Sequence, residues 1–499
     1  MRNFSKSKLM ASRQCAKRLW LELHRPELRE DSEATQMSFQ IGHQVGDMAR
    51  RIYDPQNMGA LIDVENEGFE GAFARSAALL QSSCQPIFEA GFSAAGALAF
   101  ADVMLPVQSD GQQVWRMVEV KSSTSVKDYY RDDIAVQAFV AQSAGVALQR
   151  IALAHIDNTW TYPGNGDYSG LLIETDFTKE AFSRTEEVKS WIAQAQRTSA
   201  SPTEPAIETG AHCAQPFACG FYDYCSRDEP QAEFPIHWLP RIGKKAQALA
   251  ELGVTELIDV PDDLLSARQH RVKTHTLANT VFFDAVSAAE ALAGYGLPAY
   301  FLDFESSLLA VPIWPGTRPY QQSVFQFSLH TLAASGALAH TAFIDLSGDD
   351  PSAPFANALI AVCGESGPVY VYSASFEKTR IRELAERYPH LSEALLAINE
   401  RVVDLLPIAS NYYYHPSQQG SWSIKNVLPA VVPELRYDTL DGVQDGGMAM
   451  AAYIEAIDPD TAIERKTQIE QQLLAYCKLD TYAMMRLWQV FAGRTNLKL

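Results

Sequence analysis

Charged side chains alternate with apolar ones in two short stretches of the chain, at 118–121 and at 300–305. Each stretch is typical of a strand, and the side chains of a strand point alternately to its two faces. The charged residues of each stretch, Glu119 with Lys121 and Asp303 with Glu305, therefore share one face, while apolar residues of the stretch face a core. Acids gathered in this way repel each other and lose solvation, so they persist mainly where a divalent cation neutralises them. The pattern predicts an α/β fold with two separate metal sites.

The length of the chain, 499 residues, is too great for one hydrophobic core and predicts two or three domains. No run of about 18 apolar residues occurs, so we expect no membrane span. The basic N-terminal segment lacks the apolar core of a signal peptide, which favours a cytoplasmic protein. A net charge of −19 argues against a nucleic-acid coat protein. The first thirty residues nevertheless carry eight Lys or Arg against three Glu, which indicates either a DNA-binding patch or an ordinary solvated helix face.

The first 228 residues show the element order of a small α/β domain. Ser5 can cap a helix whose apolar residues recur at helical spacing over 5–24. After it we expect a helix over 35–53, strand segments over 87–105 and 114–121, and a helix over 134–144. The element order is helix, strand, strand, strand, helix. This order, with acids on the strands, is typical of a nuclease core.

Asp102, Glu119 and Lys121 form the candidate site of this region. Glu119 and Lys121 share one face of their strand, and Asp102 on the neighbouring strand can reach the same point. Two carboxylates can hold Mg²⁺ or Mn²⁺, which activates water for attack on phosphorus. The lysine can orient the nucleophile and offset the charge that develops on the phosphate. Glu89, on the preceding strand, is a weaker candidate, and a surface strand without a site is the alternative interpretation.

Two further polar residues flank these strands. His43 precedes them on an expected helix, and Gln137 follows them on the next one. The whole set resembles the PD-(D/E)XK superfamily, in particular the RecB-type exonucleases and their CRISPR-associated relatives, and implies a restriction-endonuclease-like core. It implies three metal ligands, His43, Asp102 and Glu119. It also implies that Gln137 supports the catalytic Lys121.

Three of the seven cysteines, Cys213, Cys219 and Cys225, fall close together in a chain that is expected to be cytoplasmic, where disulfides are rare. Three thiolates need a fourth ligand to complete a zinc site or an iron–sulfur cluster. The arrangement resembles RecB-like exonucleases with iron–sulfur clusters, which place one cysteine before the nuclease core and three after it. The resemblance implies that Cys15 completes a 4Fe–4S cluster that joins the N-terminal helix to the end of the domain. The first spacing of the trio is longer than the family usually shows, so the alternatives are a Zn²⁺ site that includes His212, and buried free cysteines.

The sequence changes character after residue 228. A helical connector is expected over 229–296, and its segment 239–246 is either half of a helix-hairpin-helix, whose backbone amides would hold a DNA phosphate, or a plain linker. A new domain is expected over 297–499. We expect a strand at 300–305 and a second strand at 369–372, which leads into a helix that begins at Glu377. A final helix is expected at 464–492.

The candidate site of this second domain combines four acids and a tyrosine. Asp303 and Glu305 are one residue apart on a strand, so both face one side. Tyr476 and Asp480 stand four apart on the final helix, so they also share a face. Glu377 lies at the start of a helix that follows a strand. Such a set can hold two metal ions about 4 Å apart, one activating water and one stabilising the leaving oxygen.

The order of these residues resembles the DEDDy 3′→5′ exonucleases, which have a ribonuclease H-like fold. The resemblance implies that Asp303, Glu305 and Asp480 bind metal and that Tyr476 positions the attacking water. Glu377 stands where the family usually has an Asp. Since a Glu side chain is one methylene longer, the substitution would change the metal spacing or reduce activity. An inactive relic and a purely structural set are the alternatives.

Over the whole chain, the segments 14–20, 301–305 and 375–378 resemble a bacterial family that joins a RecB-like nuclease module to a ribonuclease H-like module. We therefore expect a metal-dependent DNA nuclease that trims single strands or free ends and removes nucleotides from 3′ ends. DNA repair or defence against foreign DNA is the expected setting. RNA is the alternative substrate, and a nucleic-acid-binding scaffold with one or both sites inactive is the alternative function. The sequence indicates no particular protein partner.

Overall fold

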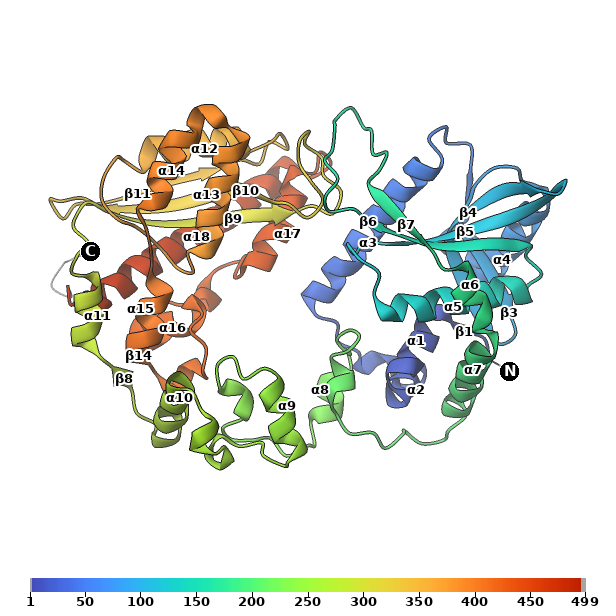
Figure 1. The fold of residues 1–499 in the computed structure, drawn as a ribbon, viewed down its shortest axis with the longest axis horizontal. Helices are drawn as coiled ribbons and strands as arrows, with labels where there is room; N and C mark the ends of the chain where they lie inside the picture. Colours follow the sequence, from blue (N-terminus) through green and yellow to red (C-terminus); the bar gives the residue numbers. More distant parts are fainter. Residues whose placement is uncertain (1, 495–499) are drawn as a thin grey trace. The chain divides into compact units, whose positions relative to one another are not determined.

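The computed structural model of the chain describes residues 2–494, which divide into two compact units. Unit 1 comprises residues 2–229 together with 309–321, and unit 2 comprises 230–308 together with 322–494. Each unit combines helices with a mixed sheet, so the fold class is α/β, as predicted (Figure 1). Residues 230–296, expected as a connector, belong to unit 2.

A seven-stranded sheet forms the centre of unit 1. Its strands are β1 (Phe4–Ser5), β2 (Ala60–Leu61), β3 (Ile87–Ala94), β4 (Ala97–Ser109), β5 (Gln112–Lys121), β6 (Leu148–Ile156) and β7 (Leu172–Asp176). They follow the order β2-β3-β4-β5-β6-β7, with β1 paired to β4. Strands β3, β4 and β5 form an antiparallel meander, whereas β6 pairs in parallel with β5. A parallel pair needs a long crossover, and here it is a helix, α5 (Asp128–Ser143).

Helices cover both faces of this sheet. Besides α5 they are α1 (Lys6–Gln14), α2 (Ala16–His24), α3 (Glu33–Tyr53), α4 (Val64–Ser82), α6 (Thr178–Ser183), α7 (Thr185–Ser199) and α8 (Tyr222–Ser226), with 3-10 turns η1 (Pro26–Leu28) and η2 (Ala211–Cys213). Helix α5 is buried along most of its length and packs with Trp115 and Met117 of β5 in the main core. On the other face, Val118 packs with Phe88 and Val103. Glu119 and Lys121 share the face of Trp115 and Met117, so the charged face of β5 is the one that α5 covers.

The predicted order of helix, three strands and helix is confirmed, but three details differ. The predicted helix over 5–24 is two helices, because Cys15 has an extended backbone (φ −161°, ψ 126°). The strand segment 87–105 is a hairpin, because Ala95 (φ 51°) and Gly96 (φ 86°) form a left-handed turn within it. Helix α4 was not predicted. Its polar and apolar residues are poorly segregated, and Gly68 (φ 67°) interrupts its first turns.

Unit 1 also contains residues 309–321, which connect two strands of unit 2. The backbone N–H of Tyr162 donates to the carbonyl of Thr317 at 2.9 Å, and the N–H of Gly316 donates to the carbonyl of Tyr162 at 2.8 Å. The Tyr168 hydroxyl donates to the carbonyl of Pro312 at 3.1 Å. No local sequence pattern indicates that this segment, which lies between two strands of unit 2, belongs to unit 1.

The sheet of unit 2 has five strands in the order β11-β10-β9-β12-β13. These are β9 (Ala299–Leu308), β10 (Gln322–Leu332), β11 (Leu338–Ile344), β12 (Val369–Val371) and β13 (Val402–Asp404). Strands β9, β10 and β11 are antiparallel, and β12 and β13 continue the sheet in parallel. The predicted strands at 300–305 and 369–372 are thereby confirmed as neighbours in one sheet.

Helices lie on both faces of this second sheet (Figure 1). One face packs against α12 (Ser352–Val362), α13 (Ser375–Arg387) and α14 (Ser392–Glu400), with η6 (Pro389–Leu391) between them. The other face packs against α17 (Gly446–Ile457) and α18 (Ile463–Phe491), of which α18 is the predicted final helix. Tyr300, Leu302 and Phe304 of β9 point into the first of these layers, as predicted. Asp303 and Glu305 consequently face α18.

The segment before β9 is helical, as expected. Its elements are η3 (Ile236–Trp238), α9 (Lys244–Glu251), η4 (Leu257–Asp259), η5 (Asp262–Leu264), α10 (Ala267–Ala278), β8 (Phe282–Phe283) and α11 (Ala285–Leu292). Only the short turn η3 precedes α9, so the described residues do not form the paired helices of a helix-hairpin-helix around 239–246. Unit 2 is completed by α15 (Leu405–Tyr412), β14 (Tyr413–Tyr414), which pairs with β8, η7 (Pro416–Gln418), α16 (Ile424–Val431) and η8 (Tyr437–Thr439). No described helix combines the length and apolarity that a bilayer crossing requires.

Candidate metal-binding sites

The first candidate site lies where β4 and β5 run side by side. The register pairs Val103 with Val118, so Asp102 stands across from Glu119. Glu119 is 1 % exposed. Its Oε1 accepts hydrogen bonds from Lys121 Nζ at 2.6 Å and from Lys6 Nζ at 2.7 Å, and Gln137 donates to its Oε2. The structure therefore brings four of the five predicted residues of this site together.

Burial acts to raise the pKa of both carboxylates of this site, but neighbouring lysines reverse the effect at one of them. Burial, reinforced by the charge of Glu119, holds the pKa of Asp102 well above its usual range. Burial would also raise the pKa of Glu119, but Lys121 and Lys6 reverse the effect and lower it. Asp102 is held in place because its Oδ2 accepts the backbone N–H of Val120 at 2.6 Å. An added cation beside Asp102 would offset the cost of its charge.

Two residues of this site were not predicted, Lys6 and Asp133. Lys121 Nζ lies 2.5 Å from Asp133 Oδ2, and Lys6 Nζ lies 3.5 Å from the same atom. Asp133 precedes Gln137 by four residues on α5, so the helical spacing that places Gln137 at the site also places Asp133 there. Lys6 is the first residue of α1, and nothing in its local sequence indicates a role.

His43 and Glu89 occupy different positions relative to this site. His43 is exposed on α3, and among the described residues it makes no hydrogen bond or ion pair. Glu89 stands across from Asp102 in the register of β3 and β4, with a left-handed backbone (φ 55°) in mid-strand. Such strain in a non-glycine residue is often found at functional sites. Burial and then Glu119 raise the pKa of Glu89, and His43 acts in the opposite direction. Glu89 is thus a stronger candidate than the sequence indicated.

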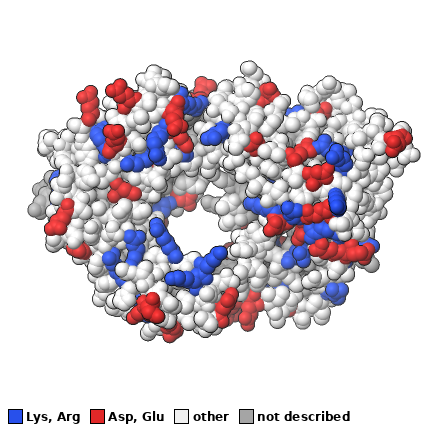
Figure 2. All heavy atoms as spheres, viewed as in Figure 1, with Lys and Arg blue, Asp and Glu red and all other residues white. Residues whose placement is uncertain are grey.

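The basic residues of the first thirty positions mostly pair with acids. Six of the eight, Lys6, Arg13, Lys17, Arg18, Arg25 and Arg29, form ion pairs with Glu or Asp. Over the visible face of the whole molecule, Figure 2 shows many Lys and Arg side chains beside Asp and Glu side chains. The segment is therefore not a free cationic surface. This favours an ordinary solvated helix face over a DNA-binding patch.

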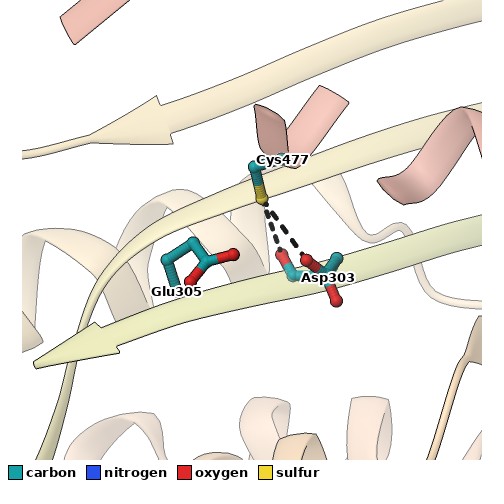
Figure 3. Close-up of side chains that lie close together, drawn as sticks. All are labelled: Asp303, Glu305 and Cys477. Atoms are coloured by element: carbon teal, nitrogen blue, oxygen red, sulfur yellow. Dashed lines mark hydrogen bonds between the residues drawn. The ribbon is translucent and has the colours of Figure 1, made fainter. Parts of the chain in front are cut away.

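The second candidate site joins β9 to α18. One ligand atom each of Asp303, Glu305 and Cys477 lies within 4.8 Å of the other two (Figure 3). The Cys477 thiol donates to Asp303 Oδ2 at 3.6 Å and contacts the Asp303 carbonyl oxygen at 3.8 Å. Cys477 is fully buried and was not predicted at this site. Cys477 precedes Asp480 by three residues on one helix, and this spacing could have placed it at the site from the sequence alone.

Asp480, one turn further along α18, is a further acid of this second candidate site. Its Oδ1 accepts the hydroxyl of Tyr437 at 2.5 Å, while its buried Oδ2 has no hydrogen-bond partner among the described atoms. The Tyr476 hydroxyl donates a hydrogen bond to the same carboxylate, which agrees with the prediction that Tyr476 and Asp480 share one face of this helix. Lys425 Nζ lies over the rings of Tyr437 and Tyr476, at 5.5 and 5.6 Å from their centres. Tyr437 was not predicted, because it lies in a short turn far from the motifs.

Glu377 lies in the first turn of α13 and is 3 % exposed. Its Oε2 is a second buried oxygen without a described hydrogen-bond partner. The turn before it contains Ser373 with a left-handed backbone (φ 73°). Asp404 stabilises this turn by accepting the N–H groups of Ser373 and Ala374 at 2.9 and 3.0 Å. Asp404 therefore supports the segment that carries Glu377.

The acids of this second site destabilise one another's charges. Burial, and then the neighbouring acids, raise the pKa of Glu305 to about 8 and that of Asp303 well above its usual range. Burial likewise raises the pKa of Glu377 to about 8 and that of Asp480 to about 7. Buried oxygens without partners and acids that repel each other are what a divalent cation would satisfy. The residues present thus fit a Mg²⁺ or Mn²⁺ site.

The four predicted cluster cysteines line one pocket in unit 1. Cys15 lies at the break between α1 and α2, and the other three come from the segment that contains η2 and α8. Gln14 joins the two parts, because its side-chain amide donates to the carbonyls of His212 at 2.7 Å and Phe217 at 2.8 Å. Cys84, in contrast, is exposed elsewhere. The structure therefore brings the predicted set together.

The spacing of these thiols bears on which group they fit. A tetrahedral zinc site with Zn–S bonds of about 2.3 Å holds its sulfurs about 3.8 Å apart. Among the described residues, however, no three cysteines have sulfurs that all lie within 4.8 Å of one another. A cubane separates its ligating sulfurs further, because iron and sulfide lie between them. Lys17 and Arg18 also line the pocket and would offset the negative charge of four thiolates. In every trio of these cysteines at least one pair of sulfurs is therefore further apart than a closed zinc site would hold them.

Comparison with known families gives one match. Residues 300–423 match a family model described as a domain of unknown function, DUF2779. The matched segment runs from β9 through β14, so it contains Asp303, Glu305 and Glu377 but not the residues of α18. No curated protein matches the chain.

Proposed function

We propose that this chain is a metal-dependent nuclease with two catalytic modules that hydrolyse phosphodiester bonds in DNA. The observation that supports it best is the group of buried acids on β9, α13 and α18. Asp480 Oδ2 and Glu377 Oε2 are buried without described partners beside Asp303 and Glu305. Such an arrangement is costly in a folded protein unless the acids bind cations.

In unit 2, Asp303, Glu305, Glu377 and Asp480 would hold Mg²⁺ or Mn²⁺. The bound cations would activate water and stabilise the leaving oxygen of the scissile phosphate. Tyr476 lies beside Asp480, where its hydroxyl can orient the attacking water. Lys425, held by the carbonyl of Gln444 at 2.7 Å, supplies positive charge next to the acids. The resemblance to DEDDy enzymes gives the proposed 3′→5′ direction.

In unit 1, Asp102 and Glu119 would hold the cation, with Glu89 as a further carboxylate of the same row. Lys121 would offset the negative charge that develops on the phosphate, and Gln137 keeps Glu119 oriented. His43 is exposed on α3 and would have to turn toward the carboxylates to act as a ligand. This module would trim single strands or free ends, in DNA repair or in defence against foreign DNA.

The test of this proposal is the degradation of end-labelled single-stranded DNA in the presence of Mn²⁺. The wild-type chain is expected to shorten the DNA, and the double variant Asp102→Asn with Asp303→Asn is expected to leave it intact. A parallel RNA substrate decides between DNA and RNA as the preferred polymer. If the double variant degrades DNA as fast as the wild type, the chain is not a nuclease of this kind. DNA binding without degradation by the wild type would support the scaffold instead.

The four pocket cysteines are proposed to hold a 4Fe–4S cluster that joins α1 and α2 to the end of unit 1. Protein purified without oxygen is expected to be brown and to contain about four iron atoms per chain. Cys213→Ser is expected to lose most of this iron and to unfold at a lower temperature, because the link between the two segments is lost. Cys84→Ser, which changes an exposed cysteine, is the control. Colourless, iron-free wild-type protein that folds stably would contradict the cluster.

A further inference from the structure

We propose that Cys477 is a metal ligand of the site in unit 2 and makes this site prefer thiophilic divalent cations, such as Zn²⁺, over Mg²⁺. The inference rests on the proposed metal site and specifies which cations that site selects. Carboxylates alone form the hard-oxygen environment that suits Mg²⁺ and Mn²⁺. A thiolate adds a soft ligand, which shifts the selectivity toward Zn²⁺ and Cd²⁺.

The geometry places the sulfur where a ligand would lie. Cys477 Sγ is 3.6 Å from Asp303 Oδ2, and one ligand atom of Glu305 lies within 4.8 Å of both residues' ligand atoms. Figure 3 shows the Cys477 side chain directed toward Asp303, with the Glu305 carboxylate beside them. Zinc bonds sulfur at about 2.3 Å and carboxylate oxygen at about 2.0–2.2 Å, so one cation can reach ligands separated by these distances. Among the described residues, no other group of three potential ligands meets the same distance limit.

A second observation, independent of the cysteine, also indicates a bound cation. Asp480 follows Cys477 by three residues on the same helix and is 6 % exposed. Its Oδ2 has no described hydrogen-bond partner, and the same holds for Oε2 of Glu377. Buried carboxylate oxygens normally accept hydrogen bonds or bind a cation. Neither oxygen belongs to the group of three, so each would reach the same cation only after a movement of its side chain.

Cation binding through sulfur requires the thiol to release its proton. In the structure the thiol hydrogen is directed to Asp303, so cation and proton compete for one position. No oxidation is involved: the S–H bond breaks, the proton passes to solvent, and the sulfur lone pair binds the cation. Serine at the same position would keep the hydrogen bond to Asp303 but offer only a weak oxygen ligand.

Cadmium provides a direct readout of the sulfur ligand that does not depend on catalysis. In ¹¹³Cd NMR the chemical shift reports how many sulfurs bind the ion. The full-length wild-type protein, with its iron–sulfur cluster loaded, is expected to show a cadmium signal typical of one sulfur with several oxygens. Cys477→Ser and Cys477→Ala are both expected to move this signal into the all-oxygen range. Cys363→Ser, which changes a second buried cysteine of unit 2, is the control and is expected to leave it unchanged.

Competition between cations gives the magnitude of the effect. In an Asp102→Asn background, added Zn²⁺ displaces bound Mn²⁺ from the site of unit 2. The EPR signal of the free Mn²⁺ measures how much is released. We expect Cys477→Ser to weaken Zn²⁺ binding by at least about 10–100-fold, the loss that removal of a residue outside the ligand shell already causes, and to change Mn²⁺ binding by less than about 3-fold. Equal weakening of both cations would indicate a purely structural role and would overturn the proposal.

The failure of this inference can be distinguished from the failure of the proposed function. If cadmium binds and Asp303→Asn abolishes that binding, but Cys477→Ser leaves the signal unchanged, the metal site stands and the role of Cys477 is refuted. If Asp303→Asn has no effect on either Mn²⁺ or Cd²⁺ binding, the metal site itself is refuted, and the role of Cys477 with it. A wild-type protein without a mixed sulfur–oxygen signal also overturns the inference.

Discussion

Asp480→Asn is expected to slow the removal of nucleotides from 3′ ends on the order of 10²–10³-fold, the loss that follows removal of one electrostatic contact to a transition state. Asp480 is 6 % exposed, its Oδ2 has no hydrogen-bond partner among the described atoms, and its charge acts on both acids of β9. Asparagine has nearly the same volume and can still accept the Tyr437 hydroxyl, so the fold should be unaffected. The rate is measured on 5′-labelled single-stranded DNA with Mn²⁺, in an Asp102→Asn background that silences unit 1.

The matched control for this variant is Glu470→Gln, which removes an exposed acid from the same helix. It is expected to leave the rate within about 2-fold of the parent, because surface substitutions of this kind change little. If Asp480→Asn behaves like Glu470→Gln, the acids of unit 2 are not a catalytic site.

The two acids of unit 1 are expected to respond differently to neutralisation. Asp102→Asn should abolish the activity of unit 1 with little effect on folding, because burial disfavours the charge of Asp102 and the amide oxygen can still accept the N–H of Val120. Glu119→Gln should abolish activity and also lower the free energy of unfolding by about 3–5 kcal/mol. The reason is that Glu119 is the shared partner of the ammonium groups of Lys6 and Lys121.

Denaturant unfolding of the two variants, combined with the labelled-DNA assay in an Asp480→Asn background, measures both effects. Glu187→Gln, a half-exposed acid of α7 that pairs with Arg184, is the control for the loss of a surface ion pair. It is expected to cost about 1 kcal/mol at most. Equal stabilities of Asp102→Asn and Glu119→Gln would contradict the assigned network of Lys6, Glu119 and Lys121.

The sequence predicted those parts of the sites that follow from local periodicity. Asp303 and Glu305 alternate with apolar residues on one strand, and this pattern was sufficient to place both on the face opposite Tyr300 and Phe304. The helical spacing of Tyr476 and Asp480 placed both at the same site. The same reasoning, applied to the other residues of these helical turns, would have found Cys477 on α18 and Asp133 on α5.

Other contributions depend on tertiary contacts that no local pattern carries. Lys6 reaches Glu119 across more than a hundred residues, and Tyr437 reaches Asp480 from a short turn. The break at Cys15 was missed because its flanking residues keep helical spacing on both sides. Residues 309–321 join unit 1 through backbone hydrogen bonds, which leave no mark on side-chain periodicity. The exposed position of His43 could not be predicted either, since ligand and surface histidines share the same helical context.

The central claim is that acids distant in the sequence converge into two cation-binding pockets, and crystals soaked in Mn²⁺ test it most directly. Anomalous scattering at the manganese edge locates the ion independently of any activity. We expect one peak between Asp102 and Glu119 and at least one beside Asp303, Glu305 and Asp480. Manganese peaks elsewhere, with both carboxylate groups free of metal at saturating Mn²⁺, would contradict the account.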